Sequence, residues 1–164
     1  MTRIISALAL GGSLLLLAGG TVAWTQSSPA QMVEQRQELM KSLFPSYYRD
    51  MAQVVRGQSN DLANVATKAS QASDALKKVA PLWPAGTGRE AVPKTRAKPE
   101  VWTQRAEFEA ALTKLVAETD AIGAAARSGN LDAVKAQWLK VAEACGACHG
   151  GPAKSGGKFR FEEP

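Results

Sequence analysis

A single motif, Cys145-Gly146-Ala147-Cys148-His149, constrains this chain more than any other feature. It holds the only two cysteines and the only histidine among 164 residues. The C-x-x-C-H pattern is the attachment site of a c-type haem, in which each thiol adds to one vinyl group of the porphyrin. Residues i and i+3 share one side of a helix, so both sulfurs can face one porphyrin edge. The histidine can then place an imidazole nitrogen on the iron. The motif therefore predicts one haem c with its iron, held through two thioether bonds.

Three other uses of such a motif agree less well with the rest of the chain. A zinc site needs four ligands, and the motif supplies three, with no second cysteine or histidine cluster to complete the set. A thioredoxin-like C-x-x-C would lie in a chain that alternates strands and helices, and no such alternation is present. A structural disulfide would leave the adjacent His149 unexplained. Covalent haem is therefore our interpretation.

Residues 1–23 have the pattern of an export signal. Arg3 supplies the positive start, an apolar run follows from Ile4 to Ala18, and Thr21-Val22-Ala23 offers small residues for cleavage. The alternative is a retained membrane anchor, because a span needs roughly 20 apolar residues. We expect cleavage and a single haem domain over residues 24–164. Bacteria attach haem covalently outside the cytoplasm, so the signal and the motif together predict a periplasmic location if the protein is bacterial.

The charge of the chain limits its partners. A formal net charge of +5 is too small to argue for nucleic-acid binding, and no stripe of basic and aromatic residues supports it. Several cations lie near the haem end, namely Lys135, Lys140, Lys154, Lys158 and Arg160. Their simplest interpretation is a solvated face, and the alternative is a docking patch for an acidic redox partner. With no second histidine and no cluster of inward carboxylates, we expect no enzyme activity.

The remaining sequence predicts an all-α fold of four helices, since no segment shows sustained strand alternation. The first helix begins at Ser28-Pro29, bends at Pro45 and ends at Gly57. The second helix is expected after Asn60-Asp61 and stops before Pro81, where a Gly- and Pro-rich loop over residues 81–98 begins. The third is expected from Pro99 to the break at Gly129-Asn130, and the fourth from Leu131 through the haem motif. Their apolar residues recur in steps of three and four, which is typical of packed helices. The short connection at Gly129-Asn130 makes the last two helices antiparallel neighbours.

The first predicted helix carries a charged residue on its apolar face. At 3.6 residues per turn, Met40 falls on the inward face, and so does Arg36 one turn earlier. A haem would explain the inward cation, because Arg36 could pair with a propionate. The alternative is a side chain that reaches out to water. Met40 is either an ordinary core methionine or a ligand of iron, since its thioether is long and flexible enough to reach a metal.

Together these features resemble the cytochrome c prime family and its low-spin relatives, the class II c-type cytochromes. The resemblance covers essentially the whole chain after the signal. It is carried by Arg36-Gln37 with Met40-Lys41, by Pro81 to Gly88, by Ala97 to Trp102 with Phe108, and by Cys145 to His149.

The resemblance implies an antiparallel up-down four-helix bundle with a covalently bound haem, usually as a homodimer in the periplasm. It implies that Cys145 and Cys148 attach the haem and that His149 is the proximal iron ligand. It also places Arg36 near a propionate and Met40 over the open face of the iron. In low-spin members a methionine there is the sixth ligand. In other members that residue does not ligate, and the iron is five-coordinate.

The end of the chain departs from the family pattern. Members usually continue Cys-His with two residues, an aromatic residue and an arginine that lies against the proximal histidine. Here Gly150 to Gly157 intervene before Lys158-Phe159-Arg160. The resemblance therefore does not assign that role to Arg160.

The sequence as a whole predicts a periplasmic monohaem carrier of electrons with His149 and Met40 as axial ligands, because methionine ligation favours reduced iron. The alternative is a five-coordinate haem protein that binds nitric oxide or carbon monoxide. The two functions differ in whether the sixth site of the iron is occupied. Redox partner proteins are expected, and membrane association only if residues 1–23 are retained.

Overall fold

The computed structural model describes residues 27–150 and 156–161 of the chain, so the predicted signal lies outside the described residues. Over these residues the fold is all-α, with one isolated antiparallel bridge between Ala97 and Arg160. Among the described helices, none has the length and apolarity that crossing a membrane requires. The helices are α1 (Pro29–Leu43), α2 (Arg49–Val55), α3 (Leu62–Val79), α4 (Glu100–Thr103), α5 (Arg105–Arg127) and α6 (Leu131–His149).

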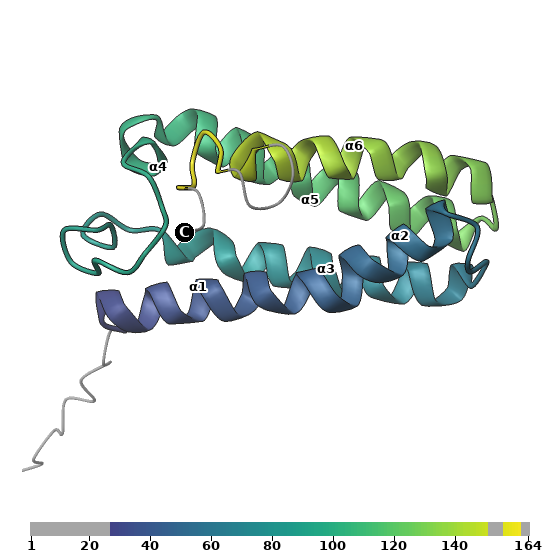
Figure 1. Ribbon diagram of the computed structural model, residues 1–164, viewed down its shortest axis with the longest axis horizontal. Coiled ribbons are helices and arrows are strands. Elements are labelled where there is room, and N and C mark those ends of the chain that lie inside the picture. Colours follow the sequence, from purple (N-terminus) through teal and green to yellow (C-terminus); the bar gives the residue numbers. More distant parts are fainter. Residues whose placement is uncertain (1–26, 151–155, 162–164) are drawn as a thin grey trace, which may run out of the picture.

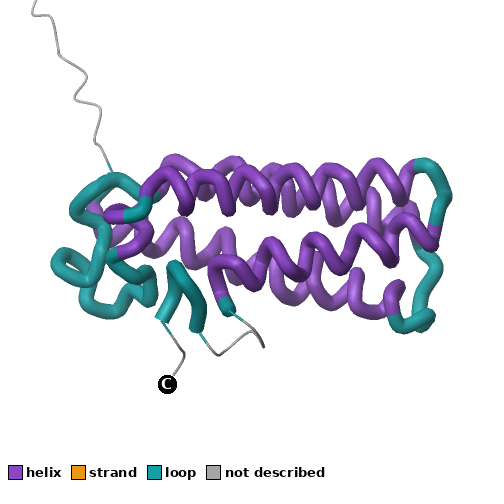
Figure 2. Tube along the Cα trace, turned by 90° about the horizontal axis from the view of Figure 1, so that it is seen from above, coloured by secondary structure: helices purple, strands orange, loops and turns teal. Residues whose placement is uncertain are grey.

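The long helices form an antiparallel four-helix bundle (Figure 1). Together α1 and α2 make the first arm, which packs on α3. In turn α3 packs on α5, α5 packs on α6, and α2 closes onto α6. The long loop before α4 lies at one end of the bundle, beside the described C-terminal segment (Figure 2). The bundle predicted from the sequence is confirmed.

The first arm is interrupted by a π-helical turn, Phe44–Tyr48, between α1 and α2. Pro45 has no N–H to donate to the preceding turn, so a regular α-helix cannot pass through it unchanged. The chain accommodates the proline with one wider turn, after which α2 continues the arm. The bend expected at Pro45 thus takes the form of a π turn. It carries Tyr47 into the interior at 6 % exposure and leaves Tyr48 at the surface at 41 %.

Side-chain caps begin three of the described helices where the sequence predicts them. At the start of α1, the Ser28 hydroxyl accepts a hydrogen bond from the Gln31 N–H at 3.3 Å, and the Gln31 side chain accepts one from the Ser28 N–H at 2.8 Å. Asp61 accepts a hydrogen bond from the Asn64 N–H at 2.9 Å, at the start of α3. Asn130 accepts one from the Ala133 N–H at 2.9 Å, at the start of α6. Each cap satisfies a backbone donor that the first helical turn leaves unpaired.

The third predicted helix is divided into α4 and α5 at Gln104. The periodicity of the sequence did not predict this division. Its φ of −118° and ψ of 47° are not helical. Immediately after the break, the Arg105 guanidinium donates a hydrogen bond to the Trp83 carbonyl at 2.8 Å. The break therefore ties the start of α5 to the long loop.

The buried apolar residues form two separate clusters. The first fills the bundle between α2, α3, α5 and α6, around Met51, Ile122 and Trp138. The second lies at the loop end and consists of Ala97, Val101, Phe108 and Phe159. The apolar residues that the sequence predicts to face inward are buried along much of each helix. On α6, however, the row is only partly buried at Cys145 and Cys148.

Candidate haem site

The haem motif occupies the C-terminal end of α6, at the break between the two core clusters. Cys145 packs against the first cluster and Cys148 against the second. The two cysteines do not form a disulfide with each other, and both side chains are partly exposed. The helix α1 reaches the same end of the bundle and packs on α3, but makes no comparable contact with α6 (Figure 1). The interruption of the core therefore coincides with the residues predicted to attach the haem.

Burial keeps the side chains of the motif neutral. It raises the pKa of the Cys145 and Cys148 thiols to about 11 each. Burial, together with the nearby cations of Arg160 and Arg96, lowers the pKa of His149 to about 4. At pH 7 the imidazole is therefore neutral and keeps a nitrogen lone pair, which is the form that binds iron.

The C-terminal segment around Phe159 lies against the haem motif, although several extra residues separate the two in the sequence. The Phe159 N–H donates to the Cys148 carbonyl at 3.4 Å, and the Lys98 N–H donates to the Phe159 carbonyl at 3.0 Å. The Phe159 ring is buried in the second core cluster. Arg160 consequently lies close enough to His149 to lower its pKa. The fold thus gives Arg160 a place beside the histidine that the family resemblance alone did not assign.

Two glycines lie where the chain leaves the haem motif, at Gly150, and where it comes back to it, at Gly157. Gly150 adopts a φ of +79°, and a Cβ added there would overlap the Gly156 carbonyl oxygen. A Cβ added at Gly157 would overlap the backbone nitrogen of Gly150 and the carbonyl of Cys148. Backbone atoms cannot move aside as the end of a flexible side chain can. Both positions therefore require glycine.

We expect Gly157→Ala to destabilise the protein by roughly 1–3 kcal/mol, as overpacking does elsewhere. The new methyl group must push the returning segment away from α6, so Phe159 should lose burial. Chemical denaturation measures the loss of stability. The control is Gly146→Ala, where an added Cβ meets no atom and alanine favours the helix. Equal stability of the two variants would show that Gly157 does not pack closely against the backbone of Gly150 and Cys148.

Arg36 is buried, at 2 % exposure, despite its charge. Its guanidinium donates four hydrogen bonds into the long loop: to Leu82 O at 3.2 Å, Thr87 Oγ1 at 3.1 Å, Thr87 O at 2.8 Å and Thr95 Oγ1 at 3.0 Å. The Trp83 ring stacks on it, with its centroid 4.1 Å from Cζ. Burial lowers the pKa of Arg36 to about 10, so it remains a cation at neutral pH. The alternative of a side chain that reaches out to water is wrong, and pairing with a propionate stays a prediction.

Met40 lies one turn after Arg36 on α1 and is partly exposed. It belongs to neither core cluster of the described residues, whereas Met51 is 1 % exposed inside the first cluster. An ordinary core methionine would have the environment of Met51. The Met40 side chain is therefore not committed to packing within the protein, and its ligation of iron stays a prediction.

A buried donor near the motif supports the fit of a haem. The indole Nε1 of Trp83 is buried and has no hydrogen-bond partner among the described residues. Trp83 borders Arg36 and packs against the second core cluster, as Cys148 does. An unpaired buried donor costs roughly 1–3 kcal/mol, which an acceptor such as a propionate would offset. Two thiols, a neutral imidazole and a nearby unpaired donor fit a covalent haem.

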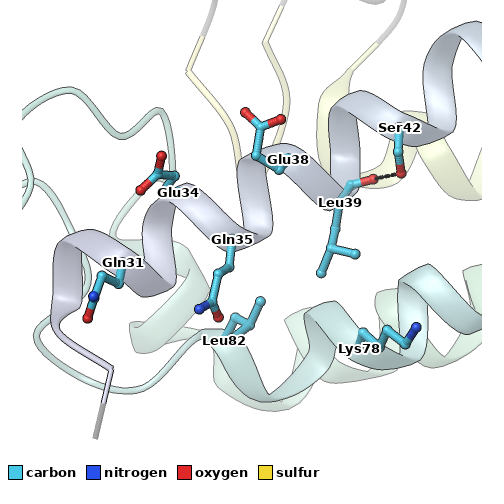
Figure 3. Close-up of a pocket in the computed structure, with 8 residues that line it drawn as sticks. All are labelled: Gln31, Glu34, Gln35, Glu38, Leu39, Ser42, Lys78 and Leu82. Carbon is cyan, nitrogen blue, oxygen red and sulfur yellow. Dashed lines mark hydrogen bonds between the residues drawn. The ribbon is translucent and has the colours of Figure 1, made fainter. Parts of the chain in front are cut away.

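A surface groove between α1 and α3 is distinct from this site (Figure 3). Its volume is about 760 Å³, and none of the predicted haem residues lines it. It is lined by Gln31, Glu34, Gln35, Glu38, Leu39, Ser42, Lys78 and Leu82.

Comparison with known proteins agrees with the geometry of the site. The family model described as Cytochrome C' matches residues 31–151. A cytochrome c' of Rubrivivax gelatinosus is 31% identical over 121 residues, which cover 74% of this chain and 92% of the relative. The chain also resembles a carbon monoxide-bound variant of cytochrome c prime from Alcaligenes xylosoxidans, with a TM-score of 0.70 at 25% identity over 83% of this chain and 98% of the other. A nitric oxide complex of another variant of that protein gives a TM-score of 0.70 at 25% identity, over 84% and 99% of the two chains.

The motif, the bundle and the comparisons lead to one family. The family model spans nearly all of the first arm, the long loop and the whole of α6, including the haem motif. A haem-free zinc or thioredoxin-like module is excluded by this match. The chain belongs to the cytochrome c prime family of monohaem c-type cytochromes, and its cofactor is a covalently attached haem c with its iron.

Proposed function

We propose that this protein binds nitric oxide or carbon monoxide at a five-coordinate haem iron, with His149 as the single axial ligand from the protein. The observation that carries the proposal is that the structural relatives include a complex with each of these gases. Both relatives share the bundle over more than four fifths of this chain. The gas would bind on the side of the haem that faces α1 and Met40.

Different residues of the chain would attach the haem and bind its iron. When bound, the haem supplies an iron that can accept a small diatomic ligand. Cys145 and Cys148 would hold the porphyrin through two thioether bonds, at the break in the core. His149 offers a neutral imidazole, which Arg160 and Arg96 help to keep unprotonated. With His149 as its ligand from the protein, the iron would keep a site open for the gas.

The second candidate function is electron transfer through an iron with His149 and Met40 as axial ligands. One observation favours it: Met40 belongs to neither core cluster of the described chain, so its thioether is free to turn toward a metal. Thioether ligation raises the potential of the iron, which suits an electron carrier. Occupancy of the sixth site separates the two candidates.

Absorption spectra of the oxidised and reduced haem protein provide the test. We expect a high-spin spectrum and an immediate change when carbon monoxide is added to the reduced protein, because the sixth site is open. Met40→Leu should then leave the spin state unchanged, since leucine replaces a side chain that does not ligate.

A low-spin spectrum that does not change when carbon monoxide is added would contradict gas binding and favour electron transfer. Met40→Leu would in that case produce a high-spin protein that binds carbon monoxide and has a lower potential. Met51→Leu is the matched control, because Met51 is buried in the first core cluster. That substitution should change neither the spin state nor the response to carbon monoxide.

We also propose export to the periplasm, on the basis of the signal pattern in residues 1–23. Acidic redox partners and a homodimer remain predictions. Among the cations near the haem end, Lys158 forms an ion pair with Glu107, which favours the solvated-face interpretation of that residue. Lys154 lies outside the described residues.

A further inference from the structure

The π turn places a surface tyrosine directly against a buried tryptophan of α6. Tyr48 is 41 % exposed, whereas Trp138, on which it packs, is 7 % exposed. Their ring centroids lie 5.0 Å apart, with 59° between the ring planes. The adjacent Tyr47 turns inward and meets the same indole edge to face, at 6.3 Å. Trp138 therefore connects a ring at the surface with the interior of the bundle.

Trp138 lies on the same face of α6 as Cys145, two helical turns before it. The two positions are about 10 Å apart along the axis, at 1.5 Å per residue. Cys145 packs against the core cluster that contains both Trp138 and Tyr47. Burial raises the pKa of Tyr47, and Cys145 lies close enough to add to the rise. Packed protein thus joins the surface ring of Tyr48 to a residue that attaches the haem.

Cations lie beside the surface ring. Arg49 follows Tyr48 and is exposed, and the partly exposed Lys135 lies one turn before Trp138 on α6. The carboxylate of Asp50 is only partly exposed and accepts a hydrogen bond from α3 at 3.2 Å. The whole chain carries a formal net charge of +5. A surface of this kind attracts a partner with an acidic face and speeds their encounter.

We propose that an acidic redox protein docks at Tyr48 and that its electron reaches the haem through Tyr48, Trp138 and the Cys145 thioether. One electron leaves the partner, which is oxidised, and arrives at the iron, which is reduced from ferric to ferrous. No covalent bond forms or breaks. Electrons cross contacting rings and bonded atoms more readily than empty space, and the Cys145 sulfur is bonded to the haem. Tyr48 is the point where this route meets the surface.

The route serves either candidate function. Carbon monoxide binds to reduced iron, so a gas-binding protein must first receive an electron. A carrier must receive one in every cycle. The proposal therefore holds whether the iron is five- or six-coordinate.

Reduction of the ferric, haem-loaded full chain by a reduced plant-type ferredoxin, which has an acidic surface, tests the route. Stopped-flow rates are measured against ferredoxin concentration, so the initial slope reports docking and the plateau reports transfer within the complex. Tyr48→Leu and Trp138→Leu should lower the plateau severalfold, whereas Tyr48→Phe keeps the ring and should not. Trp102→Leu is the matched control, because Trp102 packs against the other core cluster, and it should leave the plateau unchanged.

Charge reversal tests the docking surface. Lys135→Glu should lower the initial slope by about tenfold at low ionic strength, and added salt should remove the difference. Titration calorimetry with oxidised ferredoxin should show weaker binding by this variant without any electron transfer. Lys78→Glu is the matched control, because Lys78 lines the groove between α1 and α3, and it should change neither the slope nor the binding.

Reduction by dithionite, which is small and needs no docking surface, checks that each variant keeps an intact haem site. If Trp138→Leu does not fold, the exposed Tyr48 still provides the test of the route. The proposal is overturned if Tyr48→Leu leaves the plateau unchanged, if Trp102→Leu lowers it equally, or if Lys78→Glu slows docking as much as Lys135→Glu. The response to carbon monoxide reports the sixth site of the iron instead, so a failure of gas binding and a failure of this route are distinguishable.

Discussion

The double variant Cys145→Ala/Cys148→Ala should lose covalently bound haem completely. The two thiols are the only cysteines in the chain, so no other residue can form a thioether. They also lie where the core divides into two clusters, so without the haem this region has nothing to pack around. We expect a lower yield of folded protein as well. Haem staining after denaturing electrophoresis measures the covalent bond, and circular dichroism measures the fold.

The matched control is Ala147→Ser, which changes an exposed residue of the same motif and keeps both thiols. It should retain haem through denaturation. Each single cysteine variant should keep one thioether and an intermediate yield. A double variant that still carries haem through denaturation would contradict the attachment site.

The parts of the site that were predictable from the sequence are local. Cys145, Cys148 and His149 adjoin one another in the chain, so their spacing alone identifies the chemistry. The helices follow from steps of three and four apolar residues. Asp61 and Asn130 mark two of their beginnings, because a cap acts on a backbone donor only three residues away.

The parts that were not predictable depend on contacts between distant residues. Thr87 and Thr95 bind Arg36 from 51 and 59 residues away, in a loop without periodicity. Their only sequence signal is the presence of polar residues in a Gly- and Pro-rich segment, which is ordinary for a loop. The return of Phe159 to Cys148 likewise depends on how the residues between them fold. Ligation by Met40 depends on a small difference in position, which helical periodicity cannot define.

Burial of Arg36 makes its replacement the most destabilising single change that we expect outside the haem motif. Arg36→Leu leaves the Leu82 carbonyl and the Thr87 and Thr95 oxygens without their buried donor. Unpaired buried acceptors cost roughly 1–3 kcal/mol each, and some will find water, so a total loss of about 3 kcal/mol is expected. Chemical denaturation of the haem protein measures it. The control is Arg127→Leu, an exposed arginine at the other end of the bundle, which should cost less than about 1 kcal/mol.

The haem potential of Arg36→Leu then decides whether this arginine also serves the cofactor. Arg36 keeps its positive charge at neutral pH, and a cation beside the haem disfavours the more positive, oxidised iron. If Arg36 lies near a propionate, its replacement should lower the potential, whereas Arg127→Leu removes the same charge far from the motif and should not. A loss of stability with an unchanged potential would make Arg36 an anchor of the long loop alone. A loss of both would show that one buried cation holds the loop and tunes the iron, because the loop and the haem meet at the same end of the bundle.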